Sequence, residues 1–160
     1  MVEQQYYFDA NALFKYYQDE NGDLKIRRLV SNNQKPILVS SLTLLECLNV
    51  VMRCRRKKLF KSRRVNKIFK QLKKDARFNT TRHPFQIIPI SEEVFFEAQD
   101  ILFHHARTFQ IGSMDALHLA IVKKLPLESP PILVTSDQSM QKVCERISIP
   151  FIDPEFDSQS

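Results

Sequence analysis

Short apolar runs alternate along the chain with longer stretches in which apolar residues recur at helical spacing. Each run is four to six residues long and nearly continuous, as expected of strands that are buried on both faces of a sheet. The predicted strands are residues 5–8, 36–39, 85–90, 132–135 and 149–152.

The stretches between these strands predict helices. A turn signal, Asn21-Gly22-Asp23, ends the first helix, and no element is predicted in the polar stretch that follows it. The second and third helices follow each other directly and form a predicted helical hairpin. The predicted helices are residues 12–19, 42–58, 62–78, 91–109, 114–124 and 138–146. Strands and helices in alternation predict an α/β fold, built of βα units around a mostly parallel sheet.

Length and composition agree with one ordered domain. A chain of 160 residues can bury roughly two-thirds of the surface that its unfolded form exposes. The hydrophobic content is 43%, and there are only two glycines, so long flexible linkers are not expected. We therefore predict a single domain over residues 1–152, followed by a polar tail at residues 153–160 that frays.

The cysteines and the N-terminal residues predict a cytoplasmic protein. Cys47, Cys54 and Cys144 are odd in number and lack a Cys-x-x-Cys spacing, which argues against a disulfide framework or a zinc site. The first residues do not have the basic and apolar segments of a secretion signal. No apolar run approaches the ~18 residues that a membrane span needs.

Positive charge is concentrated in the predicted hairpin. Residues 53–77 contain thirteen Lys or Arg residues and one acid, Asp75, so this segment carries +12 while the rest of the chain carries −6. Such a surface can bind the phosphate backbone of a nucleic acid, or it can be a solvated face without a partner. The residues predicted to contact nucleic acid are Arg53, Arg55, Arg56, Lys57, Lys58, Arg63 and Arg64.

Four acidic residues occupy positions where an isolated carboxylate is costly or conspicuous. Asp9 and Asp137 each follow an apolar strand, where α/β folds bind their ligands. Glu46 interrupts an apolar helical run, and Asp115 lies in the first turn of an apolar helix. Each also has a purely structural explanation. The aspartates can cap helices or complement a helix dipole, and Glu46 can pair with Arg53 two turns later.

Taken together, these acids indicate a metal site. Carboxylates that share one crevice repel one another unless a cation compensates them. Oxygen ligands without a His or Cys cluster favour Mg²⁺ or Mn²⁺ over zinc. Such ions stabilise the charge that develops on a phosphoryl group and activate water for phosphodiester cleavage. The sequence therefore predicts a metal-dependent nuclease, with Asp9, Glu46, Asp115 and Asp137 as its catalytic and metal-ligating residues.

The four acids lie in four blocks that together resemble a PIN domain. The blocks are FDANAL at residues 8–13, SLTLLE at 41–46, DALHLA at 115–120 and LVTSD at 133–137. Each block is a weak pattern, but their order, spacing and strand-or-helix setting all match. The resemblance spans about residues 5–152. Within the family, the chain most resembles the VapC-like toxins of bacterial type II toxin–antitoxin pairs.

The resemblance implies a three-layer Rossmann-like fold with a five-stranded parallel sheet, in which the first and fourth strands are neighbours. It implies that the four acids meet at the switch point between those strands and bind Mg²⁺ or Mn²⁺ in an endoribonuclease. Asn11 would support the first acid, while Thr135 and Ser136 would support the last. The implied partners are an RNA substrate, an antitoxin protein and a second copy of the chain. An acidic antitoxin tail is then a second candidate ligand for the basic segment.

One departure leaves alternatives open. Relatives often carry a second Asp and a Phe shortly after the fourth acid, whereas Asp137 is followed by Gln138-Ser139-Met140. One metal ion is therefore favoured over two. A catalytically weak module that binds RNA or a protein is an alternative function, as is a stand-alone RNA-processing nuclease. A signalling domain with an aspartyl-phosphate is disfavoured, because helical Glu46 and Asp115 have no evident place in that chemistry.

His118 is a further candidate with two interpretations. It lies one turn after Asp115, so it can face the same crevice and touch RNA phosphate. A lone histidine on an apolar helix is more often structural, and that interpretation is favoured here.

Overall fold

The computed structural model describes residues 4–156, and contacts between residues divide the chain into two units. Of the described residues, 8–89 and 154–156 form one unit, which we call the β2 unit. Residues 4–7 and 90–153 form the other, which we call the β5 unit. The chain thus passes from the β5 unit into the β2 unit, returns, and ends in the β2 unit. The single domain predicted over residues 1–152 stays a prediction.

The β2 unit holds three parallel strands in the order β3-β4-β2. Strand β2 (Ile37–Ser40) pairs with β4 (Phe85–Ile88), and β4 also pairs with the edge strand β3 (Ala76–Phe78). Ile37, Val39 and Phe85 are fully buried, as the continuous apolar runs of these strands predict.

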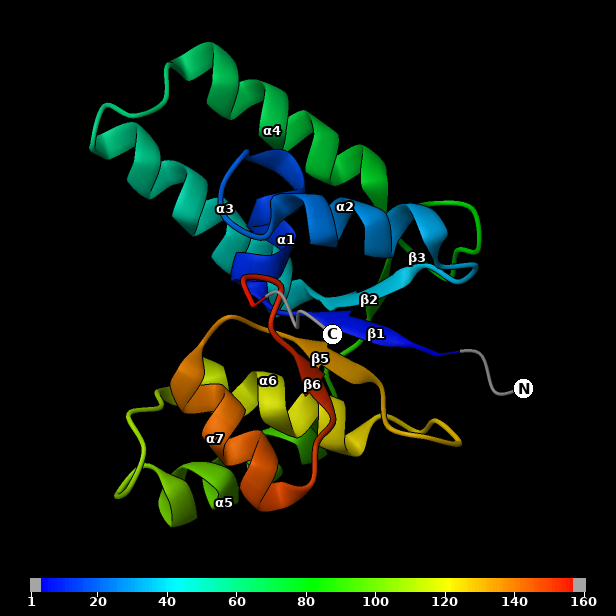
Figure 1. Ribbon diagram of the computed structural model, residues 1–160, viewed down its shortest axis with the longest axis vertical. Coiled ribbons are helices and arrows are strands. Elements are labelled where there is room, and N and C mark those ends of the chain that lie inside the picture. Colours follow the sequence, from blue (N-terminus) through cyan, green and yellow to red (C-terminus); the bar gives the residue numbers. More distant parts are fainter. Residues whose placement is uncertain (1–3, 157–160) are drawn as a thin grey trace. The chain divides into compact units, whose positions relative to one another are not determined.

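Four helices complete the β2 unit: α1 (Ala10–Tyr17), α2 (Asp23–Asn32), α3 (Ser41–Arg56) and α4 (Ser62–Asp75). Helix α1 packs against α2 and α3, and α3 packs along α4 as the predicted hairpin (Figure 1). Each helix buries one apolar stripe; in α4, for example, Ile68 and Leu72 are buried while its lysines are exposed. This is the amphipathic pattern that holds a surface helix to a core.

The described part of the C-terminal tail is bonded to α1. The Lys15 side chain is 5% exposed, and its Nζ lies 2.8 Å from Glu20 Oε1 and 2.6 Å from Glu155 Oε1. Burial alone would lower the pKa of Lys15, but its bonds to Glu155 and Glu20 outweigh burial and raise that pKa. Pro154 is buried against Gly22. The predicted fraying of the tail is therefore wrong for residues 153–156, and residues 157–160 lie outside the described part.

The β5 unit is built around the strand order β1-β5-β6. Strand β1 (Tyr6–Phe8) contributes its first two residues to this unit, and the amide of Ile132 donates to the carbonyl of Gln5 over 2.9 Å. Strand β5 (Ile132–Val134) pairs in parallel with β6 (Phe151–Ile152). The first and fourth predicted strands are therefore neighbours, as expected.

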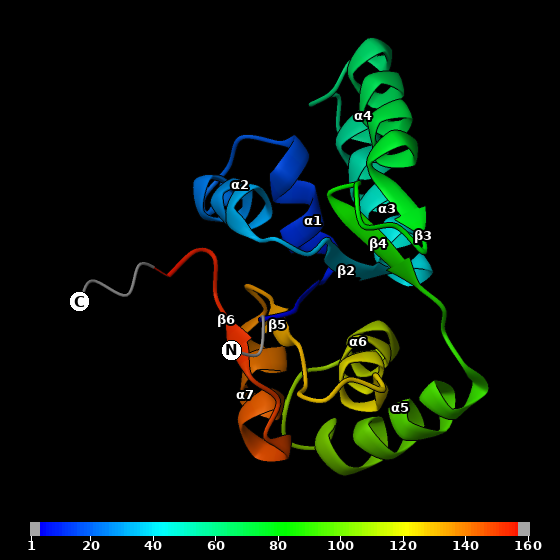
Figure 2. The ribbon, with the colours of Figure 1, turned by 90° about the vertical axis from the view of Figure 1, so that its right-hand side faces the viewer.

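The described helices of this unit are α5 (Glu92–His105), α6 (Ser113–Lys124) and α7 (Gln138–Ile147). Helix α6 packs against both α5 and α7 (Figure 2). Its Leu119, Ala120, Ile121 and Val122 are all buried. A helix that is apolar around most of its circumference lies in the interior of its unit, which is where α6 is found.

The α/β class, with parallel strands flanked by helices, is confirmed, but two details were wrong. The described residues contain six strands rather than five, because residues 76–78 form β3 instead of continuing the predicted helix over residues 62–78. Pairing with β4 outweighs the helical preference of these residues. Residues 23–32, predicted to carry no element, form α2.

The three cysteines are free thiols, as predicted. Burial raises the pKa of Cys47 and of Cys144 to about 12, so neither is a reactive thiolate at neutral pH. Among the helices of residues 4–156, none is long and apolar enough to cross a membrane.

Candidate active site

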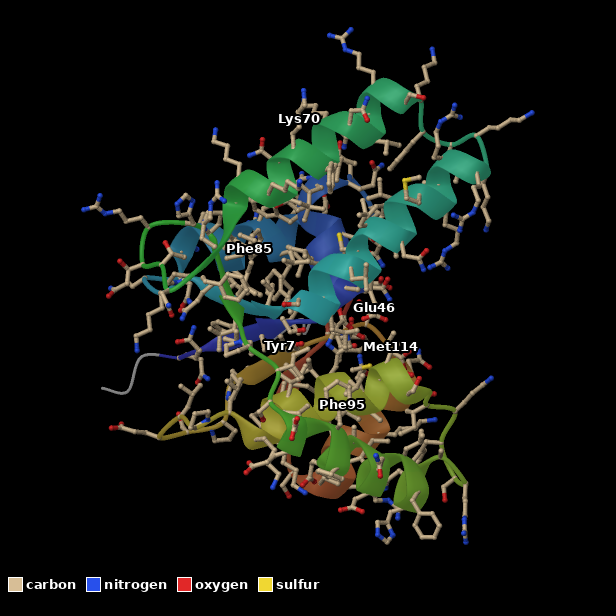
Figure 3. The ribbon with its side chains drawn as sticks, turned by 180° about the vertical axis from the view of Figure 1, so that it is seen from behind. Tyr7, Glu46, Lys70, Phe85, Phe95 and Met114 are labelled. Atoms are coloured by element: carbon tan, nitrogen blue, oxygen red, sulfur yellow. The ribbon has the colours of Figure 1, made fainter. Side chains whose placement is uncertain are left out.

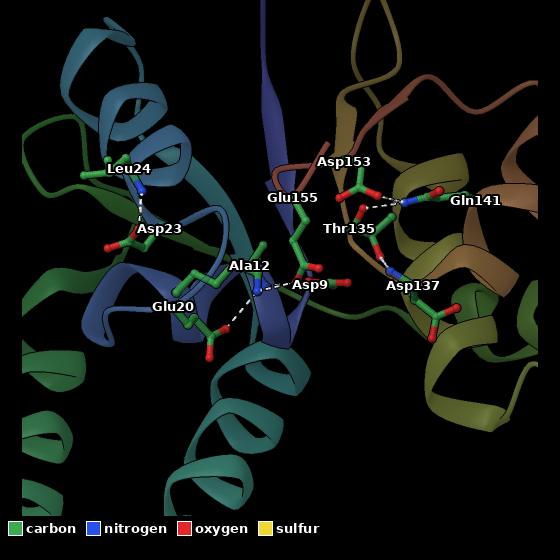
Figure 4. A network of polar contacts seen from close by, with 11 residues as sticks. Asp9, Ala12, Glu20, Asp23, Leu24, Thr135, Asp137, Gln141, Asp153 and Glu155 are labelled. Carbon is green, nitrogen blue, oxygen red and sulfur yellow. Dashed lines mark hydrogen bonds and ion pairs between the residues drawn. The ribbon is translucent and has the colours of Figure 1, made fainter. Parts of the chain in front are cut away.

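Asp9 follows β1 and caps helix α1. The residue is only 4% exposed, and its Oδ1 accepts a 2.8 Å hydrogen bond from the backbone amide of Ala12 (Figure 4). This bond satisfies one of the amides that the first turn of a helix leaves without an intrahelical acceptor. It orients the carboxylate without neutralising its charge. Asn11, which was predicted to support Asp9, is exposed on α1.

Glu46 is half-buried on α3, a helix whose start is bonded to the end of β1. Ser40 Oγ accepts from the amide of Thr43, and Thr43 Oγ1 accepts from the amide of Ser40, each over 3.1 Å. Thr43 Oγ1 also donates to the carbonyl of Phe8 over 3.2 Å. Because Glu46 lies one turn after Thr43, the helix face that carries Glu46 is tied to the strand end that carries Asp9.

Asp115 is half-buried in the first turn of α6. Its Oδ2 accepts a 2.8 Å hydrogen bond from the backbone amide of Gly112, which is the N-cap residue. Asp115 therefore has the structural role that the sequence left open, because it stabilises the N-terminus of α6. Like Asp9, it remains a carboxylate held in a fixed direction at a helix N-terminus, where negative charge is favoured.

Asp137 caps α7 in the same way as Asp9 caps α1. Its Oδ1 accepts a 2.9 Å hydrogen bond from the amide of Met140. Its own amide donates to Thr135 Oγ1 over 3.1 Å (Figure 4). Thr135 is fully buried, so this support comes from the core. The Ser136 hydroxyl is buried and has no hydrogen-bond partner among the residues that the structure describes.

Two residues beside Asp137 were missed by the sequence analysis. Gln141 Nε2 donates to the carbonyl of Thr135 over 3.0 Å and to Asp153 Oδ2 over 2.9 Å (Figure 4). Asp153 comes directly after β6, so the parallel strands β5 and β6 are each followed by a polar segment with an aspartate at the same edge. The sequence did offer a signal for Asp153, since this acid directly follows a predicted strand, as Asp9 does. It was missed because Asp153 was assigned to the tail.

His118 has a structural role. It is 2% exposed, and its Nδ1 lies 2.8 Å from the hydroxyl of Tyr7, with the two rings tilted at 59°. A buried imidazole with a hydrogen-bond partner is a satisfied core residue. The favoured structural interpretation of His118 thus agrees with its observed contacts.

The basic residues of α3 and α4 are mostly exposed. Figure 3 shows the two helices side by side, with Lys70 pointing outward from α4. Arg64 differs, because it is half-buried and its guanidinium donates to the carbonyl of Tyr17 and stacks over Phe60. Arg64 therefore holds the hairpin to α1. The other predicted nucleic-acid contacts, all exposed, are Arg53, Arg55, Arg56, Lys57, Lys58 and Arg63.

Within each unit, the structure brings two of the four acids onto connected elements. In the β2 unit, Asp9 caps α1 and Glu46 lies on α3, and these two helices pack against each other. In the β5 unit, Asp115 lies in the first turn of α6 and Asp137 caps α7, and these two helices also pack together. In neither unit do three His, Cys, Asp or Glu side chains, among residues 4–156, gather closely enough to hold a metal ion. The four-carboxylate ligand set stays a prediction.

Comparison with solved structures shows the fold. FitAcB from Neisseria gonorrhoeae aligns with a TM-score of 0.63 and 16% identity, over 94% of this chain and 98% of that chain. VapC20 of Mycobacterium tuberculosis, described as a sarcin–ricin loop cleaving toxin, aligns with a TM-score of 0.63 and 14% identity, over 86% and 94%. VapBC2 from Rickettsia felis, bound to a promoter DNA fragment, gives 0.61 and 16%, over 94% and 98%.

A search among curated proteins finds no match to the chain. The family model of the PIN domain, in contrast, matches residues 6–146, which include all four acids and most of the chain. This match agrees with the parallel α/β fold and covers the two aspartates at strand ends and the two acids on helices. The chain belongs to the PIN domain family.

Proposed function

We propose that the chain is an endoribonuclease that requires Mg²⁺ or Mn²⁺, with Asp9, Glu46, Asp115 and Asp137 as the ligands of the ion. The observation that carries this proposal is the matched placement of Asp9 and Asp137. Each follows a buried strand, and its Oδ1 accepts a hydrogen bond from the backbone amide three residues later. Both aspartates follow strand ends of the kind at which α/β folds bind their ligands.

The donor set fits a hard divalent ion. Asp9, Asp115 and Asp137 each accept a hydrogen bond from a neutral backbone amide, and carboxylate oxygens are the ligands that such an ion prefers. The buried hydroxyl of Ser136, without a partner among the described residues, adds a polar atom next to Asp137. When bound, the ion would supply charge stabilisation at the phosphoryl group and activation of water.

The residues of the chain itself would bind and orient the RNA. The exposed cations of α3 and α4 would neutralise backbone phosphates, an interaction that does not depend on sequence. Thr43 and Thr135 would hold the catalytic acids in place through the core bonds described above.

An antitoxin protein is the proposed partner, and a second copy of the chain is a further one. An apolar groove of about 500 Å³ lies between α3, α4 and the edge of the sheet, with Leu45 64% and Phe78 60% exposed. Lys73 and Arg77 line the same groove. An acidic, amphipathic segment of an antitoxin would cover its apolar floor and pair with these cations. Such a toxin would act in the cytoplasm, in keeping with the free thiols.

The proposal is tested with purified protein that carries no antitoxin. Single-stranded RNA should be cleaved in the presence of Mn²⁺ or Mg²⁺, giving products with 5′-phosphate and 3′-hydroxyl ends, and EDTA should stop the reaction. RNA that is bound without metal-dependent turnover would instead identify a binding module. Size-exclusion chromatography with light scattering would report whether the chain forms a homodimer.

The basic hairpin should determine how RNA affinity depends on salt. Changing both Arg55 and Arg56 to glutamate should weaken RNA binding and reduce the slope of log K against log[salt]. The slope should fall by about 1.4, because each phosphate contact to a single strand contributes about 0.7. Fluorescence anisotropy of a labelled RNA across a salt series measures it.

The matched control changes Arg28 and Lys142 to glutamate. These two cations are exposed and lie outside the hairpin, and their substitution alters the net charge by the same amount. If both double variants lower the slope equally, the effect comes from net charge and the hairpin is not the RNA surface.

A further inference from the structure

A cavity of about 440 Å³ lies between α1, α2 and α4 of the β2 unit. It sits beside the C-terminal end of α1, whereas Asp9 lies at the N-terminal end of that helix. Cavities of ~300–1,000 Å³ are typical of small-ligand sites. We call it the Asp75 pocket, and it is lined by Tyr16, Tyr17, Arg27, Val30, Ser31, Gln71 and Asp75.

The carboxylate of Asp75 is buried without a cationic partner. The residue is 7% exposed, Oδ2 accepts from the hydroxyl of Tyr17 and Oδ1 accepts from Gln71 Nε2, each over 2.9 Å. Both donors are neutral, and no salt bridge to Asp75 is formed by any residue from 4 to 156. A buried carboxylate is costly without a cation, and it can accept about four hydrogen bonds.

The position of Asp75 in α4 increases this cost. It is the last residue of the helix, where the carbonyl end of the helix dipole disfavours negative charge. It is also the only acid within residues 53–77, yet it points inward while Lys73 and Lys74 of the same turn are exposed. Asp75 thus lines the cavity and does not pair with the lysines that precede it in α4.

Two tyrosines present aromatic surface beside this carboxylate. The rings of Tyr16 and Tyr17 pack edge to face with centroids 5.0 Å apart, and Tyr16 packs in the same manner on Phe85 at 5.1 Å. Burial, together with the charge of Asp75, raises the pKa of both tyrosines, so their hydroxyls stay protonated at neutral pH. An aromatic face next to a carboxylate attracts organic cations.

Arg27 is the cation that lines the pocket, and it is bonded to other acids. Its Nη2 lies 2.6 Å from Asp19 Oδ1 and its Nη1 lies 2.9 Å from Asp23 Oδ2. The guanidinium of Arg27 is therefore paired with two acids that do not line the pocket, and the carboxylate of Asp75 remains available to a further positive charge.

We propose that the Asp75 pocket binds a guanidinium group. The remaining acceptor positions of the two Asp75 oxygens suit two parallel N–H donors, which a planar guanidinium presents in a fixed geometry. The tyrosine rings provide a surface on which that plane can stack. A lysine ammonium is compact and more strongly hydrated, so it should bind less well.

Titration of the full chain with N-acetyl-arginine amide tests the proposal. The chain contains four tyrosines and no tryptophan, so Tyr16 and Tyr17 contribute to its intrinsic fluorescence. We expect a saturable change in fluorescence, at least tenfold weaker binding of the neutral citrulline analogue, and several-fold weaker binding of the lysine analogue. Citrulline binding as tight as that of arginine, or no saturable change, would overturn the proposal.

Variants locate the binding. Asp75→Asn keeps the shape of the side chain and should weaken arginine binding at least tenfold. Because Asp75 is buried and that variant could fail to fold, Ser31→Lys provides a second test: Ser31 is exposed on α2, lines the pocket and would place an ammonium in it. Asn32→Lys, on the next exposed residue outside the pocket, is its matched control. Equal binding by the two lysine variants would exclude this site.

A comparison of an arginine-containing peptide with methylguanidinium identifies the source of the guanidinium group. A peptide with a central arginine that binds more tightly than methylguanidinium would identify a side chain of another protein. Equal or tighter binding of methylguanidinium would identify a free small molecule. Either result supports the guanidinium site, and neither depends on nuclease activity.

Discussion

Changing both Asp9 and Asp115 to asparagine is expected to reduce metal-dependent RNA cleavage by at least about a hundredfold, the scale on which removing a preorganised charge-stabilising group acts. Asparagine keeps the shape of each side chain, and its carbonyl oxygen can still accept from Ala12 or Gly112. At position 9, the N-cap of α1, asparagine is also as good a cap as aspartate. The melting temperature should therefore stay close to that of the parent chain while cleavage is lost. Single-turnover rates and thermal melts measure the two effects.

The control for charge is the double variant Asp100→Asn, Glu128→Gln. Both residues are exposed, and the substitutions remove the same amount of negative charge. Cleavage should be unchanged in this control. Full activity in the Asp9 and Asp115 variant would contradict the nuclease assignment, and a large fall in its melting temperature would mean that these acids act mainly as caps.

Changing Gly22 to alanine should destabilise the protein by about 2 to 3 kcal/mol, the cost of a residue held in a disfavoured backbone conformation. Gly22 has φ of +86°, and a Cβ atom there would lie 2.8 Å from the carbonyl oxygen of Pro154. Backbone cannot move aside as a flexible side chain would. The melting temperature should fall by roughly 5–10 °C. Thermal unfolding followed by circular dichroism measures the change.

The only other glycine of the chain, Gly112, provides a matched control. Its φ is −103°, and a Cβ atom would meet only Asp115 Oδ2, at 3.8 Å. Alanine at this position should change stability by less than about 1 kcal/mol, since a favourable unfolded-state effect opposes a weaker cap. Similar losses in both variants would show that contact with Pro154 does not explain the Gly22 effect.

The parallel strands and the strand-end acids could be predicted because their signals are local. A continuous apolar run followed by an aspartate, as at Phe8-Asp9, indicates both a buried strand and the edge where it ends. The helix caps could be predicted in type as well. Asp9 and Asp137 follow strands and precede helices, and each accepts the expected capping bond, from the amides of Ala12 and Met140.

The elements that were missed depend on less local effects. Helix α2 buries only Ile26 fully, with Leu29 and Val30 half-buried, so its apolar stripe is diluted by surrounding cations. Strand β3 forms because β4 offers it an edge, which helical spacing through Leu72 and Ala76 cannot reveal. Gln141 could not be identified because its role depends on two acceptors that the fold brings together, Thr135 and Asp153.

The bond between Lys15 and Glu155 has a consequence for synthesis on the ribosome. The two residues are 140 positions apart, so the emerging β2 unit contains Lys15 long before Glu155 has been translated. At about 5–20 residues per second, the interval is on the order of 10 s. During that time Glu20 is the only one of the two carboxylate partners available to a lysine that must be buried. Completion of this unit therefore waits for the translation of Glu155 rather than for the emergence of residue 89.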